Sequence, residues 1–486
     1  MSNYLTRRKS LTSLLSDASE SEKGLKRTLS STSLVALGIG AIIGAGLFSL
    51  TGIAAAENAG PAVTISFVLA GIGCAFAGLC YAEFASMIPV AGSAYTYSYA
   101  TMGEFMAWII GWDLVLEYAL GAATVGVSWS RYFLEFMSGL GIHFPASLVC
   151  GPFESVNLSN GTVIPPGIIN LPAVIIVSLL SLLLMRGTKG SSTINNILVV
   201  VKVAIVLMFI VLGWKFIKPN NYTPYIPENT GEFGHFGWSG IARGAAVVFF
   251  AFIGFDAVST AAQEAKNPQK GMPIGILGSL LVCTILYVLF AHVMTGLTPY
   301  TSFAGDAKPA ATAFAVTGYT FLLNFLIIAI LAGYTSVILV MLLGQSRVFY
   351  SMSHDGLLPK FFSDIHPKFR TPWKTNLFFA AFVSVFAGFV PISDLGHMVS
   401  IGTLLAFVLV CFGVLYMRKK MPDAKRAFKT PFVPIVPIFG ILVCLYLMTS
   451  LPLESWFRLI AWLIIGLIIY FVYGKKNSKL GTADQG

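Results

Sequence analysis

The stretch GIGAIIGAGLF, residues 38–48, contains four glycines within an otherwise apolar run. Glycine costs roughly 1 kcal/mol relative to alanine in the interior of a helix. The run nevertheless lies at the centre of an apolar segment, residues 34–56, that is long enough to cross a bilayer, which takes about 20 residues. The question is why a membrane helix has such weak helix formers at its middle.

The composition of the whole chain indicates a membrane protein built from helices. Of its 486 residues, 56% are hydrophobic and 11% are charged, whereas soluble domains carry about 25% charged residues. We therefore predict an all-α polytopic membrane protein. Its twelve predicted spans lie near residues 34–56, 62–87, 104–137, 168–186, 191–214, 239–262, 272–296, 321–346, 375–390, 394–417, 431–450 and 455–474.

Lys and Arg residues set the expected orientation. They are more frequent in the segments that would share a side with the N-terminus, by roughly five to one, which predicts that both termini are cytoplasmic. The net charge of +10 is then a topology signal, so we expect no nucleic-acid partner. Residues 1–33 are basic and rich in serine, which predicts a disordered cytoplasmic tail, and a second tail is expected at 475–486.

A second glycine-interrupted span matches the first. The sixth predicted span contains FFAFIGFDAVS, residues 249–259, and its Ile253 and Gly254 correspond to Ile43 and Gly44 of the first span. Each unit then has five spans, and five is odd, so we predict an inverted repeat of spans 1–5 (34–214) and 6–10 (239–417), followed by two extra helices (431–474).

An interruption at mid-membrane has a chemical consequence. Every backbone polar group in lipid must have a partner, so an unwound turn is tolerated where it lines a cavity. Its free N–H groups suit a carboxylate and its free carbonyls suit an ammonium group, a pair that recognises a zwitterion. Close helix packing through Gly40 and Gly44 is the alternative. Two interruptions at matching positions favour a binding site.

Four longer motifs resemble one known superfamily. They are GIGAIIGAGLF, YAEFASMIPVAGSAYTYSYATMGEFMAWIIGWDLVLEY, FIGFDAVSTAAQEAKNPQKGMPIGI and RVFYSMSHDGLLPKFF. Over about residues 33–474 the chain resembles the amino acid–polyamine–organocation superfamily, and most of all bacterial members of its cationic amino acid transporter family. This resemblance implies a five-plus-five inverted repeat with two added helices. It also implies secondary transport of amino acids, often with a proton.

The resemblance also implies the positions of a substrate site. The substrate carboxylate would meet the amides of Ala45 and Gly46, and many relatives have Ser or Thr at the position of Ala45. The ammonium group would meet carbonyls at Ile42 and in the span 6 interruption. The substrate-binding residues implied in this way are Ile42, Ile43, Gly44, Ala45, Gly46, Glu117, Phe250, Ala251, Ile253 and Met341.

Three charged residues within predicted spans need a role. Lys202 is central in span 5, where a charge costs about 2.5–3.5 kcal/mol, so we predict that it carries the coupling proton, with structural pairing as the alternative. Glu117 either pairs with Lys202 or faces a cationic substrate side chain. Arg131 lies near the outer end of span 3 and is expected to extend toward the membrane surface.

The sequence therefore predicts a secondary active transporter. It favours proton-coupled symport of small or medium neutral L-amino acids by alternating access, with an amino acid and the lipid bilayer as partners. The alternatives are a cationic amino acid transporter or exchanger, a channel, and a sensor on a transporter fold. No HExxH, Walker or metal-ligand spacing is present, so we expect neither an enzyme nor a cofactor besides the proton. The oligomeric state stays open.

Overall fold

The computed structural model describes residues 7–9, 29–88, 93–157, 163–186, 191–260, 265–306 and 308–480. Most of the predicted N-terminal tail and the last six residues of the chain lie outside this part. The described chain is helical except for a two-stranded antiparallel ladder, β1 (Val156–Asn157) with β2 (Val163–Ile164).

Helices lie at each of the predicted ranges. The α-helices are α2 (Ser31–Ile42), α3 (Thr51–Ala54), α4 (Val63–Met87), α5 (Ser93–Thr101), α6 (Glu104–Val115), α7 (Gly121–Gly139), α8 (Leu171–Arg186), α9 (Ser191–Gly213), α10 (Gly237–Val248), α11 (Ala257–Thr260), α12 (Pro268–Leu297), α13 (Pro309–Ala315), α14 (Thr320–His354), α15 (Trp373–Phe389), α16 (Ile392–Lys420), α17 (Ile435–Ser450), α18 (Leu453–Ile469) and α19 (Lys475–Asn477).

Short π and 3₁₀ turns extend or connect these helices. The π turns are η2 (Gly46–Leu50), η3 (Ala55–Ala59), η5 (Leu116–Leu120) and η13 (Tyr470–Gly474), and the 3₁₀ turns are η4 (Gly60–Ala62), η6 (Ala146–Leu148), η7 (Trp214–Phe216), η8 (Pro219–Tyr222), η9 (Phe249–Phe252), η11 (Tyr300–Phe303) and η12 (Lys360–Ser363).

Helix lengths agree with a polytopic membrane protein. Within the described ranges, 7 helical runs are long and apolar enough to cross a membrane: Gly46–Met87, Glu104–Gly139, Ile197–Phe216, Pro268–Leu297, Thr320–His354, Ile392–Lys420 and Leu453–Asn477. Five shorter apolar helices accompany them: Ser31–Ile42, Leu171–Arg186, Gly237–Phe252, Trp373–Phe389 and Ile435–Ser450. The count of twelve crossings and the inverted repeat stay predictions.

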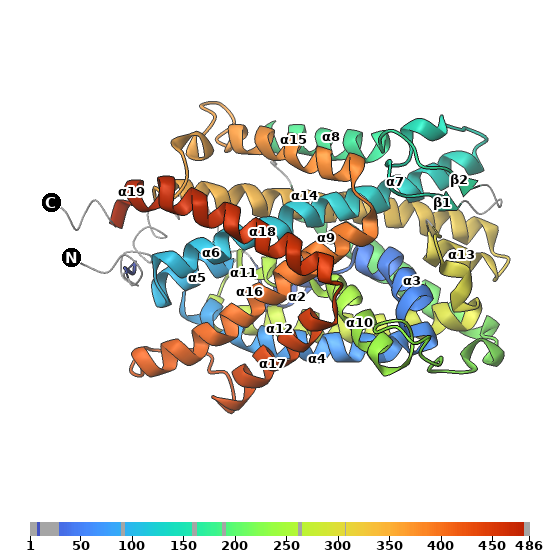
Figure 1. The fold of residues 1–486 in the computed structure, drawn as a ribbon, viewed down its shortest axis with the longest axis horizontal. Helices are drawn as coiled ribbons and strands as arrows, with labels where there is room; N and C mark the ends of the chain where they lie inside the picture. Colours follow the sequence, from blue (N-terminus) through green and yellow to red (C-terminus); the bar gives the residue numbers. More distant parts are fainter. Residues whose placement is uncertain are drawn as a thin grey trace.

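The helices form one elongated bundle (Figure 1). In it α12 packs along α2 and α4, α8 packs along α15, and α16 packs along α17. The β ladder lies at the end of the bundle opposite α19. Local sequence sets the start of α2, because the Ser30 side chain accepts a hydrogen bond from the Ser33 N–H group and caps the helix. The residues predicted to bind substrate are buried within this bundle.

Residues 7–9, within the predicted N-terminal tail, contact the helical bundle, and the disorder of that tail stays a prediction. The Lys9 ammonium group lies 3.1 Å from a carboxylate oxygen of Asp355, just after α14. The Glu104 amide, at the start of α6, donates to the Arg7 carbonyl. The Lys9 ammonium group thus meets a carboxylate, and the Arg7 carbonyl satisfies one of the free N–H groups at the start of α6.

Candidate functional site

The first predicted span is interrupted where the sequence suggested. Helix α2 ends at Ile42, and Ile43 has an extended backbone with φ −70° and ψ 107°. Helical geometry resumes at Ala45 and continues into η2. The Gly44 carbonyl accepts a hydrogen bond from the Leu47 amide at 3.2 Å, so Gly44 already belongs to the first turn after the interruption.

The second interruption follows α10 and η9. Ile253 is extended, with ψ 138°, and Gly254 has φ +107°. A Cβ atom at Gly254 would lie 2.9 Å from the carbonyl oxygen of Ala41. Glycine is therefore required here twice, for its positive φ and for its close approach to α2. The chain then turns into the short helix α11.

The two interruptions touch each other. A Cβ atom added at Gly46 would overlap the backbone of Ala251 in η9. The chain can bring the two turns this close because Gly46 has no side chain. Amide and carbonyl groups of both interrupted helices are thereby brought to one buried place, in the arrangement that the resemblance implied.

One tyrosine joins both interruptions, and the sequence analysis missed it. The hydroxyl of Tyr287, in α12, lies 3.0 Å from the Ile42 carbonyl oxygen and 2.9 Å from that of Ala251. These are two of the carbonyls expected to meet a substrate ammonium group. A signal was available in the sequence, because a tyrosine within the apolar run TILYVLF needs a partner for its hydroxyl at mid-membrane.

The remaining predicted residues surround the interruptions. Gly44 faces Val337 of α14, since an added Cβ would lie 3.4 Å from its side chain. Met341, one turn further along α14, contacts Gly121 at the start of α7. All ten predicted substrate-binding residues are buried. They lie in span 1, in η5, in η9 and the residue that follows it, and in α14.

Lys202 contacts the first interrupted helix directly. Its ammonium group donates to the Gly40 carbonyl oxygen at 2.7 Å, and the residue is 2% exposed. That carbonyl is one of the last four of α2 and has no partner within the helix. The lysine stem lies against Gly333 of α14, where a Cβ atom would lie 3.1 Å from Lys202 Cε. Lys202 thus bridges α9 to the end of α2.

Glu117 does not pair with Lys202, so the first of the two alternatives for this carboxylate is wrong. Glu117 lies in the π turn η5, and such turns are frequent at functional sites. It lies next to Asp256, whose carboxylate accepts a hydrogen bond from the Tyr118 hydroxyl. Neither Glu117 nor Asp113 forms an ion pair within the part of the chain that the structure describes.

Arg131 forms an ion pair at the end of the bundle. It is 7% exposed and lies 2.6 Å from the Glu154 carboxylate, in the loop before β1. The loop carboxylate satisfies the guanidinium through a charge-assisted hydrogen bond, and the extension of Arg131 toward the membrane surface stays a prediction. A second ion pair, Lys308 with Glu135 at 3.0 Å, lies at the same end of α7.

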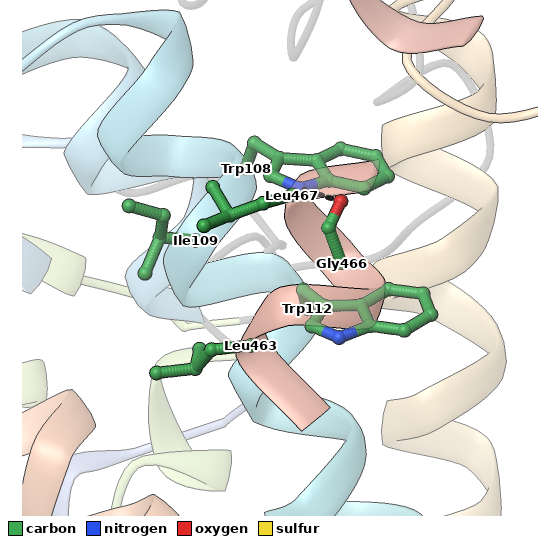
Figure 2. Close-up of a pocket in the computed structure, with 6 residues that line it drawn as sticks. All are labelled: Trp108, Ile109, Trp112, Leu463, Gly466 and Leu467. Carbon is green, nitrogen blue, oxygen red and sulfur yellow. Dashed lines mark hydrogen bonds between the residues drawn. The ribbon is translucent and has the colours of Figure 1, made fainter. Parts of the chain in front are cut away.

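An apolar pocket lies elsewhere in the bundle and has no polar side chain suited to a zwitterion. Trp108, Ile109 and Trp112 of α6 line one side of it (Figure 2). Leu463, Gly466 and Leu467 of α18 complete its lining. The Trp108 indole N–H donates to the Gly466 carbonyl, so these indoles tie the two helices together. The pocket shares no residue with the two interruptions.

Comparison with known proteins identifies the family. A model of the amino acid permease family matches residues 29–472. The chain belongs to the amino acid permease family. This confirms the predicted resemblance to the amino acid–polyamine–organocation superfamily, and it makes the protein a membrane transporter and not an enzyme.

Three relatives of this permease illustrate the range of the family. It is 48% identical to the branched-chain amino acid permease BcaP of Bacillus subtilis, over 99% of this chain and 100% of the relative. It is 42% identical to the methylthioribose transporter of Bacillus subtilis, over 98% and 99%. It is 31% identical to the vacuolar cationic amino acid transporter 4 of Arabidopsis thaliana, over 99% and 97%.

Proposed function

We propose that this permease is a secondary active transporter that moves L-amino acids across the plasma membrane by alternating access, together with a proton. The observation that carries the proposal is the contact between the two interruptions at Gly46 and Ala251. It brings backbone amide and carbonyl groups of two half-helices to one buried point, which suits the carboxylate and ammonium groups of an amino acid.

The side chains around that point favour a neutral substrate. Phe250, Ile253 and Met341 are apolar and buried, and they would surround the substrate side chain. The relative at 48% identity is named as a branched-chain amino acid permease, which agrees with such a pocket. Glu117 supports the alternative of a cationic substrate, as do the relatives named as cationic amino acid transporters.

The membrane arrangement that we propose has twelve spans, with spans 1–5 and 6–10 inverted and both termini cytoplasmic. Support comes from Asp355, which binds the Lys9 side chain through its carboxylate and the Lys479 amide through its backbone carbonyl. The two ends of the described chain therefore meet at one end of the bundle, as an even number of crossings requires.

Proton coupling would act through Lys202. A charge-assisted hydrogen bond from its ammonium group to the Gly40 carbonyl would hold α9 to the interrupted helix. Loss of the proton would weaken this bond and favour the other membrane face, so that proton and substrate bias one equilibrium. A sodium ion beside this lysine would be repelled by about 4 kcal/mol at a separation of 4 Å and an effective dielectric near 20.

The decisive experiment is uptake into proteoliposomes that contain the purified protein. We expect an inward proton gradient to drive accumulation of leucine or alanine with no dependence on sodium, and unlabelled substrate on the far side to stimulate exchange. A channel or a sensor would give no such stimulation. A thermal-shift screen of the twenty amino acids and methylthioribose defines the ligand. A shift with methylthioribose alone would overturn the amino acid assignment.

A further inference from the structure

Tyr287 is held in a fixed position at the junction of the two interruptions. The residue is 0% exposed and lies within α12. Its ring contacts Phe67 of α4, at a centroid distance of 5.5 Å, and Phe252 of η9, at 5.4 Å. These two rings leave the hydroxyl pointing at the Ile42 and Ala251 carbonyl oxygens, with which it makes its two hydrogen bonds.

The Tyr287 hydroxyl has one hydrogen to donate, but it lies against two carbonyl oxygens. A tyrosine hydroxyl carries one hydrogen, so it cannot donate fully to two oxygens at once. The Ile42 carbonyl ends α2 and lacks a partner within that helix. Ala251 lies in a 3₁₀ turn that ends at the next residue. Among the contacts of the described residues, these two carbonyls share the Tyr287 hydroxyl as a donor, which leaves part of their buried hydrogen-bonding capacity unused.

The side of the first interruption that faces α14 is the side where a ligand is expected. Tyr287 approaches from α12, whereas Gly44 of the same interruption faces Val337 of α14. A carbonyl oxygen has two lone pairs and can accept a second hydrogen bond from another direction. An ammonium group carries three N–H donors, enough to supply both carbonyls at once.

We propose that Tyr287 is a positioning residue that holds the Ile42 and Ala251 carbonyl oxygens together, so that both interrupted helices recognise the amino group of one substrate. This inference rests on the proposed function, because it assumes that the site binds an amino acid. It adds a residue outside the ten predicted ones and assigns it to the selection of α-amino acids over analogues without the ammonium group.

The test compares Tyr287→Phe with the wild type. Phenylalanine keeps the ring and its packing but removes the hydroxyl. The probes are leucine uptake and its inhibition by 2-hydroxy-4-methylpentanoate, in which a hydroxyl replaces the ammonium group. We expect KM for leucine to rise about tenfold, the scale of one charge-assisted hydrogen bond. The inhibition constant of the hydroxy acid and the maximal exchange rate should change less than twofold.

Tyr132→Phe is the matched control. Tyr132 is also 0% exposed, and its hydroxyl donates to the Phe48 carbonyl of the same first span, outside the interruption. This variant should leave the ratio of leucine to hydroxy-acid affinity unchanged. If Tyr287→Phe leaves that ratio at the wild-type value or raises it, Tyr287 is a packing residue and the inference is wrong.

Two further outcomes can be told apart: a Tyr287→Phe variant that does not insert, and a failure of the proposed function itself. If Tyr287→Phe does not insert, Phe67→Leu retains the hydroxyl but removes one ring that holds it, and it should lower the same ratio by a smaller factor. An unchanged ratio in Phe67→Leu would also overturn the inference. A wild-type protein that neither binds nor transports any amino acid would instead refute the proposed function.

Discussion

The two interrupted helices meet at one place, but their backbones are interrupted in different ways. In the span 6 interruption the chain turns at Gly254, whose φ of +107° suits glycine. In the span 1 interruption the turn is made by Ile43, in an extended conformation that any residue adopts. A glycine-rich run in a membrane helix therefore marks the neighbourhood of an interruption without locating the residue that turns.

The four glycines of residues 38–48 serve two purposes. Gly38, Gly40 and Gly46 each lie where an added Cβ atom would crowd or overlap a neighbouring segment. Gly44 has room, because the closest side chain, that of Val337, would lie 3.4 Å from its Cβ. Close packing therefore accounts for Gly38, Gly40 and Gly46, and Gly44 is the glycine for which ligand binding stays the proposal.

Gly46→Val should have the largest effect of any change at the interruptions. The new side chain would overlap the backbone of Ala251, which cannot move without displacing η9. Overpacking of this kind costs about 1–3 kcal/mol or more, so we expect little folded protein in detergent by size-exclusion chromatography. Gly139→Val, at a position with no atom within 4 Å, is the control. A folded, monodisperse Gly46→Val protein would contradict the close contact.

Gly254→Ala should follow in size. A left-handed conformation costs a residue with a side chain roughly 1–2 kcal/mol, and the new methyl group would press on the Ala41 carbonyl. We expect a lower unfolding temperature and loss of leucine uptake. Gly318→Ala controls for strain alone, because Gly318 also has positive φ but has nothing within 4 Å. If both variants lost the same stability, the contact with α2 would not contribute to the effect of Gly254→Ala.

Much of this arrangement was predictable from the sequence. Apolar runs predicted the helix positions, because in lipid the N–H and C=O groups of the backbone must hydrogen-bond to each other. The matching positions of Ile43 and Ile253 in spans 1 and 6 predicted where these two helices are interrupted. The mid-membrane position of Lys202 indicated a residue with a role, and the structure places its ammonium group on the Gly40 carbonyl.

Contacts across the bundle were not predictable in the same way. Tyr287 joins residues that are 245 and 36 positions away in the sequence, and no local pattern specifies such a pairing. The pairing of Arg131 with Glu154 was missed because it depends on the path of a loop. The relation of Glu117 to Asp256 depends on the π turn that rotates this part of the helix, which the sequence did not indicate.

Lys202→Ala separates proton coupling from substrate binding. The variant removes the only donor that the described contacts give to the Gly40 carbonyl, yet it leaves Gly46, Ala251 and Tyr287 in place. We expect proton-driven accumulation of leucine to be lost, while exchange of leucine across the membrane persists. Lys308→Ala, which removes another buried lysine, paired with Glu135 of α7, should retain accumulation. Full proton-driven accumulation by Lys202→Ala would refute its proposed role.

Gly44→Ala should have the smallest effect and is the sharpest test of the span 1 interruption. Its methyl group would make ordinary contact with Val337, and alanine is a better helix former than glycine, so the protein should fold and insert. The same methyl group would point toward α14, where the substrate is expected, and crowd it there. We expect KM for leucine to rise about threefold to tenfold, on the order of 1 kcal/mol, with an unchanged unfolding temperature. Gly139→Ala should change neither quantity. A wild-type KM in folded Gly44→Ala would mean that the first interruption serves helix packing alone and that the substrate binds elsewhere.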